Sequence, residues 1–213
     1  MIKQLKMGMK MLRYTFGIKT SLGLGGVLFV LGILFHGTGG SGSYLILTGG
    51  LWIVQLLYSL PVSGMIQTSP WKRELQTSGV AIVSFFSFLF FYLIDAVLLL
   101  LFEQQKVNMI GTKLVIDGII ILFFMIYCGF AYKFFIVSTI LFLVSYFGMS
   151  FVQRINVGNN IYTWLNSISL VQGAIIGGIL IVLGGLVQYA VSCLVYKCPF
   201  DKNSQLRGLQ KFM

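Results

Sequence analysis

Charged residues are scarce in this chain of 213 residues, and acidic ones are the scarcer kind. Asp and Glu together number 5 and Lys and Arg number 15, so charged residues make up 9% of the chain. A water-soluble domain carries about 25% charged residues, which excludes that class of protein. The formal net charge of +10 would suit a nucleic-acid partner, but there is no soluble basic domain to carry it. We therefore expect no nucleic acid among its partners.

Histidine and cysteine are equally rare. The single histidine, His36, excludes a metal site built from several histidines, and a serine–histidine catalytic site would have to depend on it. The three cysteines are an odd number, with Cys128 and Cys193 inside apolar runs, so they imply no disulfide framework. A G-x-x-x-x-G-K-[ST] loop, which binds phosphate in ATPases, does not occur. We expect no catalytic residues, metal site or cofactor on this chain itself.

Long apolar runs fill most of the sequence. Hydrophobic residues make up 57% of it and the mean hydropathy is +0.92. A helix of about 20 apolar residues spans a bilayer core of roughly 30 Å. The sequence thus predicts a single all-α transmembrane domain over residues 1–213. Its six predicted spans are about 21–36, 44–64, 79–102, 114–131, 134–152 and 168–196. The fourth and fifth runs are nearly continuous, and we place a turn between them near Lys133.

The basic residues indicate how these spans are oriented. With the N-terminus inside, twelve of the fifteen Lys and Arg residues fall on the cytosolic side, and Lys106, Lys113 and Arg154 fall outside. Cytosolic loops of membrane proteins carry such an excess of positive charge. We therefore predict a multi-pass protein of the cell (plasma) membrane, bacterial in origin, with both termini in the cytosol.

The first nineteen residues have the pattern of an amphipathic helix lying on the membrane. Apolar residues recur at three- and four-residue spacing from Ile2 to Phe16, which places them on one helical face. Such a helix buries its apolar face in lipid and turns its basic face toward the headgroups. A solvated basic tail is the alternative. The basic residues on the neighbouring face are Lys3, Lys6, Lys10 and Arg13.

The loop between the second and third predicted spans has a different character. Ser69 can cap a short helix that has Pro70 at its first position, with the negative charge of Glu74 in the early turns. An amphipathic helix of this kind can dock into a groove on a cytosolic protein, while the alternative is a basic interfacial loop anchored by Trp71. The residues of this candidate docking loop are Pro70, Trp71, Lys72, Arg73, Glu74 and Leu75.

Asp95 is the most informative single residue in the predicted spans. We place it near the middle of the third span, where a carboxylate costs about 2.5–3.5 kcal/mol and is usually sheltered or protonated. It either handles a substrate or a proton, or is hydrogen-bonded to a neighbouring helix, for example through the hydroxyl of Tyr92. We expect no basic partner at similar depth.

Gly173 and Gly177 form a G-x-x-x-G pair that allows close helix packing, and we expect this packing to occur within one chain.

This organisation resembles the membrane subunits of type-two ATP-binding-cassette exporters. The features that match are the amphipathic segment 1–19, six spans with both ends inside, the loop at 68–77, and the segment 153–167 before the last span. The resemblance implies a permease that moves a hydrophobic or amphipathic substrate by alternating access. It also implies a separate ATP-binding subunit, holding ATP and Mg²⁺, that grips the loop at 68–77, which would act as a coupling helix. A second permease chain, identical or homologous, would complete the pathway.

Two other classes of protein remain open at this point. One is the substrate-binding membrane component of a vitamin or metal importer, which has a similar size and also lacks a nucleotide site. The other is a non-transporting immunity or regulatory membrane protein. The basic N-terminal segment and the charged loop at 68–77 favour the exporter.

Overall fold

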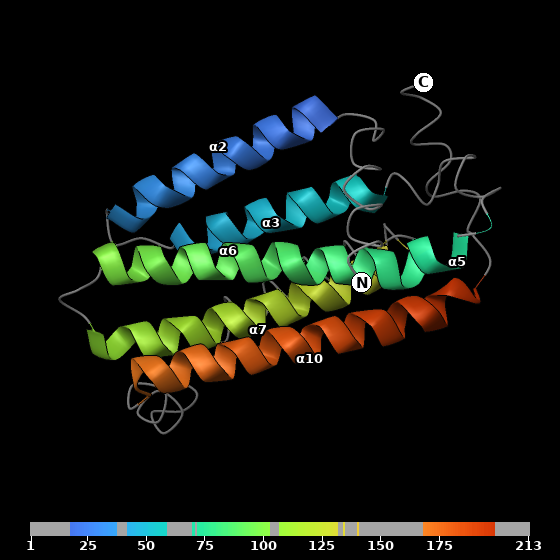
Figure 1. Cartoon of the computed structure of the whole chain (residues 1–213). Coiled ribbons are helices and arrows are strands. Elements are labelled where there is room, and N and C mark those ends of the chain that lie inside the picture. Colours follow the sequence, from blue (N-terminus) through green and yellow to red (C-terminus); the bar gives the residue numbers. More distant parts are fainter. Residues whose placement is uncertain are drawn as a thin grey trace.

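The computed structural model describes residues 18–37, 42–58, 70, 72–102, 107–131, 134, 140 and 168–198. All regular structure in this part of the chain is helical, as the sequence predicts, and Figure 1 shows the helices side by side. The elements are α2 (Ile18–Gly37), α3 (Gly42–Tyr58), α5 (Lys72–Glu74), the π-helical turn η1 (Leu75–Gly79), α6 (Val80–Phe102), α7 (Val107–Ala131) and α10 (Leu170–Tyr196).

The helices run along one another in alternating directions, except for α7 and α10, which are parallel (Figure 1). We call the end of the bundle where α2 and α6 finish the Phe102 end, and the opposite end, where α5 and η1 lead into α6, the Arg73 end. The parallel arrangement of α7 and α10 is the one that a further span between them would require. Only residues 134 and 140 of the span predicted at 134–152 are described, and residues 1–17 of the amphipathic segment predicted at 1–19 lie outside the described residues.

Three described helices are long and apolar enough to cross a membrane: Gln76–Phe102, Ile110–Ala131 and Leu170–Tyr196. A shorter apolar helix covers Leu22–His36. The predicted spans agree with α2, α6 and α10 to within about three residues at the described ends, whereas α7 begins at Val107 and not near residue 114. Lys113 therefore lies inside a helix and not in the loop before it, which corrects the predicted boundary.

Many apolar side chains lie on the outside of the described helices and several polar ones lie inside, which is the reverse of a water-soluble protein. One face of α10 exposes Val171 (64%), Ile175 (57%), Ile179 (54%) and Leu186 (62%) at intervals of four to seven residues. Soluble monomers rarely expose a continuous apolar face of this length. The fully buried side chains include polar ones, among them Ser84, Asp95 and Gln188. This arrangement is compatible with a membrane-embedded protein, in which lipid covers the apolar faces.

Glycines bring α7 and α10 into close contact. A β-carbon added to Gly118 would lie 2.8 Å from the α-carbon of Gly177, and one added to Gly111 would lie 2.5 Å from the carbonyl oxygen of Ile168. Near the Arg73 end, a β-carbon on Gly129 would lie 2.9 Å from Cγ1 of Val191. The predicted Gly173–Gly177 pair therefore packs within the chain, against α7. Lipid offers apolar groups an environment as favourable as a helix surface, so close van der Waals contact of this kind is what holds membrane helices together.

The start of α10 is fixed by a reciprocal cap. The backbone N–H of Gln172 donates to the Ser169 hydroxyl over 3.3 Å, and the backbone N–H of Ser169 donates to Oε1 of Gln172 over 3.1 Å. These two bonds satisfy backbone donors that the first turn of a helix otherwise leaves unpaired. The cap sets the position at which α10 begins beside Gly111 of α7.

Candidate functional site

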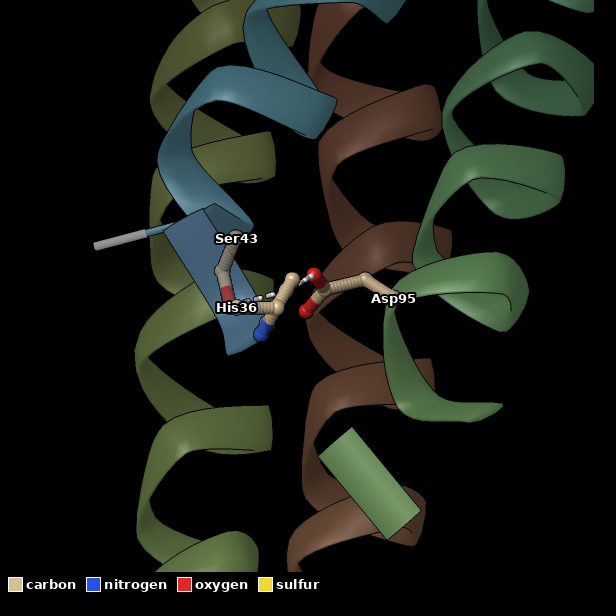
Figure 2. Close-up of polar contacts among 3 residues, drawn as sticks. All are labelled: His36, Ser43 and Asp95. Atoms are coloured by element: carbon tan, nitrogen blue, oxygen red, sulfur yellow. Dashed lines mark hydrogen bonds and ion pairs between the residues drawn. The ribbon is translucent and has the colours of Figure 1, made fainter. Parts of the chain in front are cut away.

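A buried polar pair joins α2 to α6 near the Phe102 end of the bundle. Nε2 of His36 lies 2.8 Å from Oδ1 of Asp95, and the two side chains are 1% and 0% exposed. Figure 2 shows Asp95 reaching from α6 toward His36, with Ser43 of α3 beside them. The Ser43 hydroxyl oxygen lies 3.5 Å from the same Nε2 atom, at the outer limit of a hydrogen bond. The three residues come from three different helices.

Local backbone packing brings His36 and Ser43 together. A β-carbon on Gly42 would lie 2.5 Å from the carbonyl oxygen of Gly32 and 2.7 Å from the backbone nitrogen of His36. Glycine at position 42 thus allows the first turn of α3 to touch the last turn of α2. Toward the Arg73 end the two helices are less closely packed at the described glycines, since a β-carbon on Gly49 would lie 3.6 Å from the Gly25 carbonyl oxygen. The tilt of α2 away from the other helices is visible in Figure 1.

The donors and acceptors of the pair restrict its chemistry. A carboxylate only accepts hydrogen bonds, so an ionised Asp95 requires Nε2 of His36 to carry the shared proton and to donate it. Ser43 approaches Nε2 as well, and not Nδ1. In a serine–histidine–aspartate catalytic triad the serine and the aspartate bind opposite nitrogens of the imidazole. The three side chains therefore do not form a proton relay that would activate Ser43 as a nucleophile.

Further buried polar groups surround the pair. Tyr92 lies one helical turn before Asp95 on α6. Among the buried atoms of the described residues that have no hydrogen-bond partner are Nδ1 of His36, Oδ2 of Asp95 and the Tyr92 hydroxyl. The same part of the chain contains no group of three or more His, Cys, Asp and Glu side chains placed to bind a metal ion. The groups present are suited to exchanging protons.

A second buried polar contact lies closer to the Arg73 end. Nε2 of Gln188 on α10 donates to the Ser84 hydroxyl on α6 over 2.9 Å, and this hydroxyl donates to the carbonyl oxygen of Val80 over 2.8 Å. Both side chains are fully buried. Neither can ionise, so this contact resembles the His36–Asp95 pair in burial but not in charge. It provides a natural control for experiments on the pair.

The predicted docking loop is helical in its second half but is continuous with the span that follows. α5 begins at Lys72, leads into η1 and then into α6, and side-chain bonds from Thr77 to the Arg73 carbonyl (2.7 Å) and from Ser78 to the Glu74 carbonyl (3.1 Å) follow the same turns. Pro70, Arg73 and Glu74 are exposed. The side chains of Trp71, Lys72 and Leu75 lie outside the described residues, as do Lys3, Lys6, Lys10 and Arg13.

The sequence singled out Asp95 but not its partner. We expected no basic group at its depth, and His36 proves that expectation wrong. The error came from placing Asp95 near the middle of its span. It lies seven residues before the last residue of α6, Phe102, or about 10 Å along the helix axis. His36 is the next-to-last residue of α2, so the two side chains meet where α2 ends, about two turns before the end of α6.

Compared with known proteins, the chain matches no family model, no curated protein and no solved structure.

Proposed function

We propose that this chain is the permease subunit of a membrane transporter, driven by a separate ATP-binding subunit that contacts the Arg73 end of α6. One observation carries the proposal. The helix that begins at Lys72 continues without a break through η1 to Phe102, with Arg73 and Glu74 exposed at one end and Asp95 buried near the other. A force applied to the exposed end is thereby transmitted along a single helix to a buried contact with another helix.

The proposal explains why the exposed end of this helix is charged while the faces around it are apolar. Arg73 and Glu74 offer one charge of each sign to a partner in water, just before the first buried residues of α6. The resemblance to type-two ATP-binding-cassette exporters supplies the class of partner and the direction, which is export of a hydrophobic or amphipathic substrate. Two permease chains would form the pathway between them, embedded in the plasma membrane with both termini in the cytosol.

Hydrolysis of Mg-ATP by the complex isolated from native membranes tests this proposal. The full-length chain is purified in lipid nanodiscs, and the ATPase activity that accompanies it is measured for the wild type and for Arg73→Glu. We expect Arg73→Glu to lose most of this activity, because reversing the charge at the proposed contact repels the partner. Lys197→Glu is the matched control, since Lys197 is also basic, exposed and located at the Arg73 end, but on α10.

Three results would contradict the proposal. The wild-type chain would purify without ATPase activity, or the two charge reversals would have equal effects. Alternatively, a small molecule would remain tightly bound to a chain that has no associated ATPase, which would point to the binding component of an importer.

A further inference from the structure

Among the contacts described between helices, the His36–Asp95 pair stands out because both of its members can change charge. The Ser84–Gln188 contact is as deeply buried but is neutral at every pH. Ionisable side chains are expensive to place inside a membrane protein, and those that occur there commonly serve proton or ion pathways. The pair also sits at a helix end, about 10 Å from Phe102, where a proton has a short distance to travel.

The number of protons on the pair sets its net charge. With a neutral imidazole donating to an ionised Asp95, the pair carries one negative charge. One additional proton makes it neutral, whether that proton is on Nδ1 of His36 or on Oδ2 of Asp95. Both atoms are buried and have no hydrogen-bond partner in the described part of the chain, so neither position is blocked. Because an unbalanced charge in the protein interior is costly, the two proton counts differ in how well the closed contact is tolerated.

We propose that His36 and Asp95 form a proton-binding site, and that the bound proton holds α2 against α6. With the additional proton the contact is between an imidazolium and a carboxylate, or between two neutral groups, and it is stable in a buried environment. Loss of the proton leaves a net negative charge that is stabilised only by separation and access of water. The contact therefore opens as the pH rises, and protons enter and leave from the Phe102 end.

α2 is the helix that we expect to respond. Its closest backbone contacts with α3, at Gly32 and Gly42, lie near the His36 end, and a β-carbon added to Gly23 or Gly26 would meet nothing within 4 Å. Besides the His36–Asp95 pair, an edge-to-face arrangement of Phe29 and Phe91, with ring centroids 6.2 Å apart, joins α2 to α6. Many of the large side chains along α2, such as Leu34 (61% exposed), face away from the other helices. Of these contacts, only the His36–Asp95 pair can change charge.

Other titratable groups lie on the helices around the pair. Tyr92 is the neighbour on α6, and α7 carries Lys113 and Asp117, with Tyr127 and Cys128 farther toward the Arg73 end. Neither α3 nor α10 contains a charged residue within its described bounds, and the other basic residue of α2, Lys19, lies at the opposite end of that helix. Glu103 and Lys106 follow α6 in the chain and lie outside the described residues. The proposed proton site follows from the geometry of the pair and does not depend on whether an ATP-binding subunit drives the protein.

The single histidine allows a direct test. In the full-length protein in lipid nanodiscs, selective ¹⁵N labelling of histidine produces signals from His36 alone. We expect these signals to report a change of protonation as the pH is stepped between about 5 and 9. In Asp95→Asn, the proton concentration at the midpoint of this change should differ from that of the wild type by about tenfold or more. Gln188→Leu, which removes a buried polar group that cannot ionise, should leave the midpoint unchanged.

Amide hydrogen exchange measured on the same samples tests the consequence for α2. After correction for the intrinsic pH dependence of exchange, amides of residues 31–37 and 42–47 should exchange faster once His36 has lost its additional proton, with the same midpoint as the ¹⁵N signal. His36→Gln should abolish this pH dependence. Comparing the wild-type protein at different pH values needs no variant, so this test remains valid even if Asp95→Asn does not fold.

Three outcomes would overturn the inference. A histidine signal that does not change over this pH range, or that titrates identically in Asp95→Asn, would show that the pair is not a shared proton site. Exchange in residues 31–37 and 42–47 that does not follow the histidine signal would show that the proton does not control α2.

Discussion

Replacing Gly177 by alanine should destabilise the protein, whereas the same change at the adjacent Gly178 should not. A β-carbon at position 177 would collide with the Tyr92 hydroxyl and would lie 2.8 Å from the carbonyl oxygen of Leu114. The tyrosine ring can turn away, but the Leu114 carbonyl belongs to the backbone of α7. To restore an ordinary contact of 3.4 Å, α7 and α10 must separate by about 0.6 Å, the difference between these two distances.

The magnitude follows from how steeply close contacts depend on distance. A gap of 0.5–1 Å forfeits about a quarter to a half of each van der Waals contact that it opens, and overpacking costs about 1–3 kcal/mol. Alanine gains about 1 kcal/mol over glycine in helix propensity, which offsets part of this cost. We therefore expect Gly177→Ala to lose up to about 2 kcal/mol of unfolding free energy. Gly178→Ala meets nothing within 4 Å, so it should gain up to about 1 kcal/mol.

Unfolding of the full-length protein by sodium dodecyl sulfate in mixed detergent micelles, followed by circular dichroism, measures both variants against the wild type. The two substitutions add the same methyl group at adjacent positions of one helix, so differences in lipid solubility or expression cancel. Equal effects of the two variants would refute the close packing of α7 and α10 at this position. A stabilised Gly177→Ala would refute it as well.

Three further predictions concern other contacts. Ser84→Ala should destabilise the protein by about 1–2 kcal/mol in the same unfolding assay, because it leaves the buried amide of Gln188 without its acceptor. Gln188→Leu should cost less, since the Ser84 hydroxyl keeps its bond to the Val80 carbonyl; the opposite order would contradict the contact. Ser169→Ala should remove about 1 kcal/mol by breaking the cap of α10, and amides of its first turn should exchange faster with solvent in mass spectrometry, while unchanged exchange would exclude the cap. Gly42→Ala should push α3 away from His36 and move the ¹⁵N signal of that histidine toward its position in Asp95→Asn, and an unaltered signal would show that Gly42 does not place the pair.

The helical class and most of the described boundaries could be predicted from hydropathy, because an apolar run long enough to cross a bilayer leaves few other folds open. The start of α7 could not be predicted from hydropathy. Residues 107–113 contain Asn108 and Lys113, which lower the local hydropathy, yet they continue the helix and pack beside the first turn of α10 through Gly111. Hydropathy reports which residues prefer lipid, whereas a helix can extend beyond that boundary.

The sequence predicts only part of the site. A carboxylate in an apolar run is visible in any sequence, and this pattern identifies Asp95. Its partner lies 59 residues earlier in the chain, and nothing in the local pattern around His36 indicates which helix it faces. The pairing follows from the depth of both residues together with the close approach of α2 and α3 at Gly32 and Gly42, and that approach is a property of the packed helices.

α6 makes a buried polar contact with each of two other helices, α10 and α2. Its Ser84 bonds to Gln188 of α10, which in turn is held against α7 by glycines along its length. Its Asp95 bonds to His36 of α2, near the close approach of α2 and α3 at Gly32 and Gly42. The first contact cannot change charge, while the second can. If the ATP-binding partner proposed above moves the exposed start of α6, the contact between α6 and α2 is therefore the one whose strength the proposed proton site would control.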